Sequence, residues 1–297
     1  MTLDEQKQYR LGLAYVAISA LAWSSSGLFM RAITTDLTTI LFCRGIVSGT
    51  VIFLFFFYVE GRRAIAILKN IGWPTIGATI FSSASMISGL GSMYYTSVAD
   101  AMVIYATVPF VTAALAYLFI GEKPSRSTLI ASCVAFAGVL VMLAGSEGGG
   151  SLLGKGLAAI MTVTVAIMAT IMRKHRDVPM LPAMGLSAWL CSLVTVWFAA
   201  PLAVSGADIG LLVGFAIVQN AFGLILYTYG APRIPAADAS LLTALEVPLT
   251  PLWVWIFMAE VPSHATLIGG PIVLLALFGH IFMEVRRNRV VVPATVI

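Results

Sequence analysis

Ten apolar stretches of roughly twenty residues follow one another along the chain, and they restrict its fold more than any other feature. A helix needs about 20 apolar residues to cross a bilayer. Only 10% of the residues are charged and 60% are hydrophobic, whereas a soluble domain carries about 25% charged residues. These figures exclude a water-soluble enzyme, a nucleic-acid-binding module and a disordered chain. The stretches lie near residues 11–33, 37–59, 71–95, 99–120, 127–145, 153–173, 179–204, 209–231, 235–259 and 264–284.

The positive charges between these stretches indicate an orientation in the membrane. Cytoplasmic loops of membrane proteins carry an excess of Lys and Arg. If all ten stretches span and both termini are cytoplasmic, the inside segments hold 14 Lys and Arg residues and the outside loops hold 2. We therefore predict an all-α integral protein of the cell inner membrane with ten transmembrane helices and cytoplasmic termini. The inside residues are Lys7, Arg10, Arg62, Arg63, Lys69, Lys123, Arg126, Arg173, Lys174, Arg176, Arg233, Arg286, Arg287 and Arg289.

The sequence also repeats itself at an offset of 138 residues. The tripeptide ADA at 99–101 recurs at 237–239, and TLI at 128–130 recurs at 266–268. Each copy contains five spans, an odd number, so the second copy is predicted to be inverted. Inverted repeats are typical of transporters that open to each side of the membrane in turn, although a relic of gene duplication would leave the same pattern. The predicted parts are a first repeat at 1–145, a flexible junction at 146–152, a second repeat at 153–285 and a cytoplasmic tail at 286–297.

Two charged side chains lie well away from the ends of predicted spans, where each costs about 2.5–3.5 kcal/mol. Glu246 lies about 18 Å along the ninth span, near the midplane. Its carboxylate can hold a substrate ammonium, take up a proton or fix helix packing. Arg44 lies about 12 Å into the second span. Its guanidinium can bind a substrate carboxylate or anchor its own helix.

Other polar and aromatic residues of the spans are candidates for a cavity lining. The amide of Asn220 can both donate and accept, which suits a zwitterion, but interhelical bonding explains it equally well. Small residues around Ser82 indicate close helix packing or a shared lining. Aromatic side chains with few polar groups are typical of small-molecule pockets. The predicted substrate-binding residues are Trp23, Ser26, Arg44, Ser82, Tyr105, Asn220, Tyr227, Glu246 and Trp253.

Three prolines inside predicted spans interrupt helical hydrogen bonding, because proline has no N–H to donate. Pro109, Pro248 and Pro251 are predicted hinges, and passive kinks are the alternative. No histidine pair has the spacing of metal ligands, and no nucleotide-binding motif is present. We therefore expect neither a metal nor a cofactor.

Paired Glu-x-Pro-Ser turns at 122–125 and 260–263, the in-span prolines, Arg44 and the two five-span halves resemble the drug/metabolite transporter superfamily. The chain is similar to its EamA-type members over nearly its full length. Among these it most resembles the YddG-type amino-acid exporters. The resemblance implies ten helices, internal symmetry, cytoplasmic ends and export of small metabolites.

The leading functional hypothesis is a secondary transporter that exports small metabolites, foremost aromatic or neutral amino acids, by alternating access through a central cavity. Its partners would be that substrate and the lipid bilayer, with no nucleic acid, and the chain would be a monomer or weak homodimer. Whether export is proton-coupled or facilitated stays open. The main alternative is an accessory membrane subunit without transport activity. A membrane-embedded enzyme ranks lower, because the sequence contains no nucleophile–base or metal constellation. A channel also ranks lower, because a simple pore has no need of inverted repeats.

Overall fold

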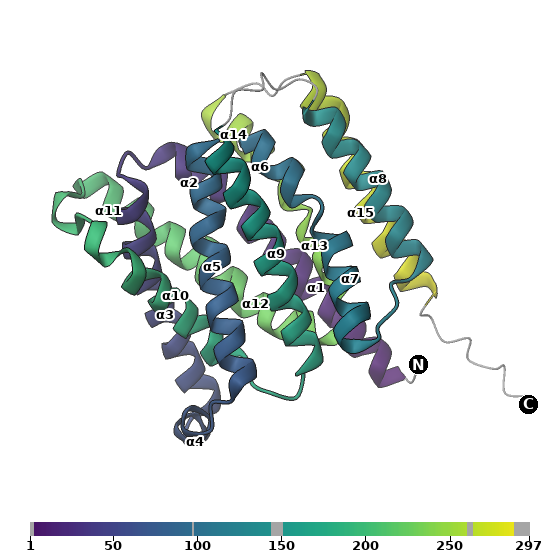
Figure 1. Cartoon of the computed structure of the whole chain (residues 1–297), viewed down its shortest axis with the longest axis horizontal. Coiled ribbons are helices and arrows are strands. Elements are labelled where there is room, and N and C mark those ends of the chain that lie inside the picture. Colours follow the sequence, from purple (N-terminus) through teal and green to yellow (C-terminus); the bar gives the residue numbers. More distant parts are fainter. Residues whose placement is uncertain (1–2, 97, 144–150, 260–263, 288–297) are drawn as a thin grey trace, which may run out of the picture.

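The computed structural model describes residues 3–96, 98–143, 151–259 and 264–287, and every regular element in these ranges is helical. The helices form one bundle (Figure 1). In chain order they are α1 (Leu3–Ser24), α2 (Ser26–Ala32), α3 (Leu37–Glu60), α4 (Arg63–Lys69), α5 (Trp73–Tyr95), α6 (Val98–Tyr105), α7 (Val108–Ile120), α8 (Arg126–Leu143), α9 (Leu152–Lys174), α10 (Leu181–Thr195), η1 (Val196–Phe198), η2 (Pro201–Ala203), α11 (Gly206–Gly214), η3 (Phe215–Phe222), α12 (Gly223–Gly230), η4 (Ala231–Arg233), α13 (Ala236–Thr243), α14 (Glu246–Met258) and α15 (His264–Arg287).

Within the described ranges, nine helical segments are long and apolar enough to cross a membrane. Within the described part of the predicted fifth span, the apolar helix Arg126–Met142 is shorter than these nine segments. This helix, α8, packs along α15 (Figure 1). The all-helical, multi-span fold is therefore confirmed, while the count of ten stays a prediction. Most of the predicted junction at 146–152, the turn at 260–263 and the tail beyond 287 lie outside the described residues.

Two spans differ from the predicted ranges. The first helix begins at Leu3 rather than near residue 11, and two acidic residues occupy its first turn, where the helix dipole favours negative charge. The predicted seventh span, 179–204, is α-helical only from Leu181 to Thr195 and continues as the short turns η1 and η2. Trp197 in η1 is 82% exposed, a position typical of aromatic residues at a membrane interface.

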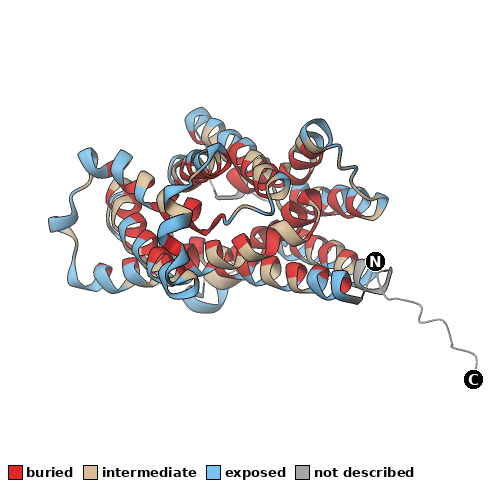
Figure 2. Cartoon of the chain, turned by 90° about the horizontal axis from the view of Figure 1, so that it is seen from below, coloured by how far each residue is buried: buried red, intermediate tan, exposed pale blue. Residues whose placement is uncertain are grey.

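Burial in this bundle is reversed relative to a water-soluble protein. Large apolar side chains cover the outside: Leu54, Leu118 and Leu275 are 65–73% exposed. Charged side chains lie inside, with Arg44 3% and Glu246 5% exposed. Figure 2 shows the buried residues on the inward faces of the helices. An apolar exterior of this extent is unstable in water and matches a lipid environment, so the chain is a multi-pass membrane protein.

The fourth and ninth predicted spans are each broken into two helices. In the first, α6 ends at Tyr105 and α7 begins at Val108; in the second, α13 ends at Thr243 and α14 begins at Glu246. Tyr105 and Thr243 are 138 residues apart, the repeat offset, and the Tyr105 hydroxyl donates to Thr243 Oγ1 at 3.5 Å. The two repeats therefore break at equivalent positions, and the breaks meet inside the bundle.

Two of the three predicted hinge prolines lie directly after these breaks. Pro109 is in the first turn of α7 and Pro248 is in the first turn of α14. Proline is tolerated in a first turn because its missing N–H has no intrahelical partner there. Pro251 lies further inside α14. The prolines thus favour the breaks, and their action as hinges stays a prediction.

Both α7 and α14 end on a residue in the left-handed conformation. Gly121 ends α7 with φ 76° and ψ 11°, and Ala259 ends α14 with φ 56° and ψ 18°. These two residues again differ by the repeat offset. In the described part of the chain, Ala259 is the single non-glycine residue with positive φ. A side chain in this conformation costs about 1 kcal/mol, so the second repeat carries a strain that the first avoids.

We expect Ala259→Gly to stabilise the protein, because glycine adopts the left-handed conformation without a steric cost. The gain should be about 1 kcal/mol, or a rise in Tm of roughly 2 °C in detergent for a chain of this size. Gly121→Ala is the matched control and should lower Tm by a similar amount. A lower Tm for Ala259→Gly would contradict this account of the α14 end.

Candidate functional site

A cavity of about 90 Å³ lies inside the bundle, between helices of both repeats. We call it the central cavity. It is bordered by α1, α2, α3, α5, α6, α9, η3, α12 and α14. Seven of the nine predicted binding residues line it, although they are scattered over more than 220 residues of sequence. These seven are Trp23, Ser26, Arg44, Ser82, Tyr105, Asn220 and Glu246.

The other two predicted binding residues are not among those that line the central cavity. Tyr227 is 1% exposed and packs against Trp23 with ring centroids 5.2 Å apart. Trp253 donates from its indole nitrogen to Ser24 Oγ at 2.7 Å. Both side chains therefore contact the first transmembrane segment, where Tyr227 supports the ring of a lining residue.

Arg44 reaches the cavity from α3. Its guanidinium donates to Gln219 Oε1 at 2.8 Å and lies over the Phe215 ring at 5.0 Å. An arginine side chain has five N–H donors, and its Nε has no partner. Asp36 is the N-cap of α3, and its side chain accepts from the Thr39 N–H at 2.9 Å. Arg44 is thus held in position while part of its donor capacity stays unused.

Glu246 is the first residue of α14, directly after the break in the ninth span. A helix N-terminus favours a carboxylate, because the N–H groups of the first turn point toward it. The carboxylate is within hydrogen-bond reach of the Tyr105 hydroxyl, which comes from the break in the other repeat. Each repeat therefore places its broken end beside this carboxylate.

The charges of Arg44 and Glu246 are buried without ionic partners. Among the described residues, no ion pair joins either side chain to an opposite charge, although both line the same cavity. A buried charge is costly unless it is paired or hydrogen-bonded. Two unpaired opposite charges in one cavity are complementary to a ligand that carries both signs.

Two neighbouring amides reach the cavity from η3, a stretch of π-helix. Gln219 accepts from Arg44, and the Asn220 amide donates to Ser48 Oγ at 2.8 Å. Both amides thus bond α3, which supports the interhelical alternative for Asn220. A π-helix is rare and occurs frequently at functional sites. Here it turns two consecutive polar side chains toward the same helix.

Sequence reasoning did not single out the methionines of the lining or Gln219. Met86, Met93, Met161 and Met168 border the central cavity. A signal was available, because 86 and 93 on α5, and 161 and 168 on α9, are two helical turns apart and share a face. Another serine of α5, Ser88, is not among the lining residues and donates to the Ala84 carbonyl of its own helix.

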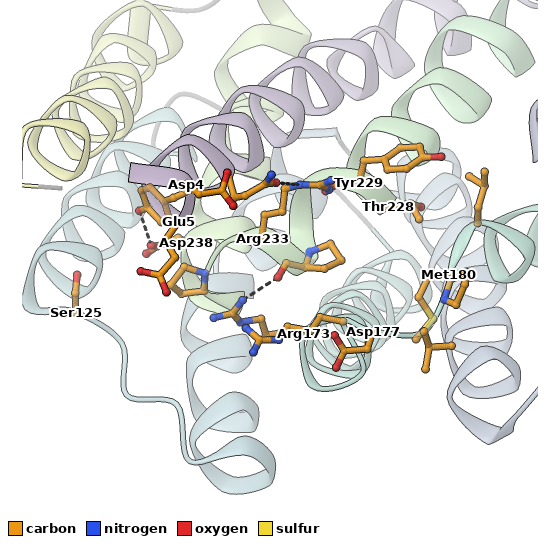
Figure 3. Close-up of a pocket in the computed structure, with 18 of the residues that line it drawn as sticks. Asp4, Glu5, Ser125, Arg173, Asp177, Met180, Thr228, Tyr229, Arg233 and Asp238 are labelled. Carbon is orange, nitrogen blue, oxygen red and sulfur yellow. Dashed lines mark hydrogen bonds between the residues drawn. The ribbon is translucent and has the colours of Figure 1, made fainter. Parts of the chain in front are cut away.

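A second cavity, of about 960 Å³, opens at one end of the bundle. Its lining comes from the start of α1, the end of α3, the α7–α8 loop, the α9–α10 loop and the α12–α13 connection (Figure 3). We call this the basic end, because these are segments in which the sequence concentrates Lys and Arg. Arg173 lies here and donates to Glu122 Oε2 at 3.0 Å and to the Pro232 carbonyl at 2.8 Å.

Asp238 lines the cavity at the basic end and accepts hydrogen bonds from neighbouring helices. It lies in the first turn of α13, where the helix dipole favours a carboxylate. Its carboxylate accepts from the Thr128 hydroxyl at 2.6 Å and the Tyr9 hydroxyl at 3.2 Å, and His280 Nε2 lies 3.5 Å away. Figure 3 shows Asp238 beside the beginning of α1. The cluster therefore joins α13 to α1, α8 and α15.

Nine candidate spans among the described residues, two matching helix breaks and an internal cavity that holds one arginine and one glutamate are features expected of a membrane transporter. The EamA-like transporter family model matches residues 10–144 and again residues 152–282, so the chain belongs to this family and carries its domain twice. The resemblance to this family is thereby confirmed, and the YddG-type subfamily stays a prediction. Among the residues described, no group of three or more His, Cys, Asp or Glu side chains could hold a metal ion.

A solved structure, titled "Crystal structure of protein", is similar to this chain with a TM-score of 0.78. The similarity covers 96% of this chain and 99% of that one, at 17% sequence identity. At this identity the likeness shows the fold. No curated protein matches the chain in sequence.

Proposed function

We propose that the protein is a secondary transporter of small zwitterionic metabolites, foremost amino acids with neutral or aromatic side chains. The observation that carries this proposal is the pair of buried, ionically unpaired charges in the central cavity. The Glu246 carboxylate would bind the ammonium of the substrate, and the Arg44 guanidinium would bind its carboxylate through the fork geometry that suits such groups. Trp23 and Tyr105 would contact the side chain.

Alternating access is the mechanism proposed for this cavity. α8 serves as the tenth span, and the two repeats are inverted relative to each other. Transporters of this kind place discontinuous helices at the binding site, and the breaks at Tyr105–Val108 and Thr243–Glu246 meet beside Glu246. Pro109 and Pro248 would act as hinges when one half moves against the other. Export from the cytoplasm follows if the basic end is the side on which substrate enters.

Reconstitution tests the function directly. Purified protein in liposomes should accelerate the flux of labelled neutral or aromatic amino acids, and preloading with unlabelled substrate should drive counterflow of label. Counterflow separates a carrier from a channel, because only a carrier exchanges a bound substrate molecule on one side of the membrane for one on the other side. Empty liposomes and liposomes with heat-denatured protein are the controls. Absence of accelerated flux across a panel of amino acids and amines would overturn the proposal.

The orientation is tested by cysteine labelling in cells. We expect Arg176→Cys, at the basic end, to react with a membrane-impermeant maleimide only after the inner membrane is permeabilised, because Lys- and Arg-rich segments face the cytoplasm. Lys155→Cys, in the first turn of α9, should react in cells with an intact inner membrane. Both variants are made after Cys43, Cys133 and Cys191 are replaced by alanine. The reverse labelling pattern would show that the orientation is wrong.

A further inference from the structure

Four of the chain's 13 methionines border the central cavity. Met86 and Met93 come from α5, and Met161 and Met168 come from α9. These two helices pack side by side along their lengths. We call the four side chains the methionine wall. The charged groups of the cavity come from other helices, since Arg44 lies on α3 and Glu246 on α14. The wall is therefore built from helices that contribute none of the charged groups of the cavity.

The central cavity is small for a ligand site. Its volume is about 90 Å³, whereas small-molecule pockets generally occupy about 300–1,000 Å³. Space for a substrate must therefore come from movement of the lining. Methionine is unbranched, with three rotatable bonds and a polarisable thioether, so it changes shape at low cost and also contacts aromatic rings favourably. The wall is the part of the lining best suited to such a change.

A glycine supplies room for one of these movements. Gly89 on α5 faces Met161 on α9, and a Cβ at position 89 would stand only 3.1 Å from Met161 Sδ and 3.3 Å from its Cε. Both residues line the cavity. The missing side chain therefore leaves the Met161 thioether against the backbone of α5. Any side chain at position 89 would push the thioether away from this place.

We propose that the methionine wall makes the cavity polyspecific toward the apolar part of its substrate. By rotating, the thioethers admit amino acids whose side chains differ in size and shape, from small aliphatic to aromatic. The common ammonium and carboxylate are held by Glu246 and Arg44. Surfaces rich in methionine bind diverse partners because they can repack. This inference rests on the proposed function, since it takes the zwitterion site as given.

The test measures counterflow of alanine, leucine, phenylalanine and tryptophan in liposomes. The wild type should transport all four with KM values within about tenfold of one another. Gly89→Ala should raise KM for phenylalanine and tryptophan at least about tenfold, with alanine changed less than about threefold, because a pocket misfit of one methyl group discriminates by roughly this factor. Met161→Ile should act similarly, because branching at Cβ stiffens the side chain. Met161→Leu, whose side chain is not branched at Cβ, should retain much of the wild-type range of substrate sizes.

Gly91→Ala is the matched control. A Cβ at position 91 would also approach α9 at 3.1 Å, but its neighbour is Leu157, which does not border the cavity. This variant should change all four KM values equally. Equal effects of Gly89→Ala on all four substrates, or a wild type that accepts side chains of only one size, would overturn the inference and leave the zwitterion site intact. No flux for any of the four would overturn the proposed function itself.

Discussion

Replacing Glu246 with glutamine is expected to abolish measurable transport of amino acids while leaving the protein folded. Glutamine has nearly the same shape but carries no charge to receive the substrate ammonium. Truncating one partner of a buried charge pair costs about 2 kcal/mol or more, which corresponds to a loss of at least about 30-fold in affinity. Binding of phenylalanine, measured by tryptophan fluorescence or by competition in counterflow, reports this loss.

A substrate analogue without an ammonium distinguishes a binding role of Glu246 from a structural role. Phenylpropionate lacks the ammonium, so its weak competition should not be reduced in Glu246→Gln relative to wild type. Because Glu246 is buried without an ionic partner, removing its charge should leave Tm unchanged or raise it. Asp208→Asn is the control: this carboxylate is also buried, but it accepts from the Thr34 hydroxyl at 2.8 Å, away from the cavity. A fall in Tm for Glu246→Gln with normal phenylalanine binding would contradict the proposal.

Arg44→Met is expected to have the second large effect, in this case on recognition of the substrate carboxylate. Methionine retains much of the apolar volume of the arginine stem and removes the donors that would bind the substrate carboxylate. Phenylalanine binding should weaken by about 2 kcal/mol or more, at least about 30-fold. Phenethylamine lacks the carboxylate, so its competition should change little. Arg44→Lys should recover part of the affinity, because it keeps the charge but not the planar fork.

The two variants together give a pattern that a packing role would not produce. Glu246→Gln should spare the ligand without an ammonium, and Arg44→Met should spare the ligand without a carboxylate. If Arg44 served only to anchor α3 to Gln219 and Phe215, Arg44→Met would lower Tm and affect both ligands alike. That result would assign Arg44 to the structure of the bundle rather than to the site.

The site could be predicted in large part because membrane burial makes polarity informative. A charge within an apolar span is costly, and this alone singled out Arg44 and Glu246. Asn220 was recognised by the same contrast with its apolar surroundings, Ser82 by the small residues around it and Tyr105 as an aromatic side chain. The methionines were missed for the converse reason, since an apolar residue in an apolar span carries no such signal. Their place in the lining depends on how α5 packs against α9.

Other features lie beyond sequence reasoning for reasons of geometry. Trp253 follows Glu246 by seven residues, so helical spacing puts both on one face. A helix in contact with several neighbours presents more than one inner face, and Trp253 bonds Ser24 instead. The π-helix that presents Gln219 and Asn220 packs against α3, and no pattern in the local sequence distinguished it from an ordinary helical turn. Pro248 indicated an interruption of the ninth span. The position of this break opposite Tyr105 arises only when the two halves assemble.

The sequence by itself determined that this chain crosses a membrane repeatedly as helices and that its second half copies its first. Apolar length and the repeat offset are properties of the chain, and they act locally on each segment. The tertiary structure decided which polar side chains meet, because contacts such as Tyr105 to Thr243 join helices from different repeats. Packing geometry between distant helices sets those meetings, and no local pattern encodes it.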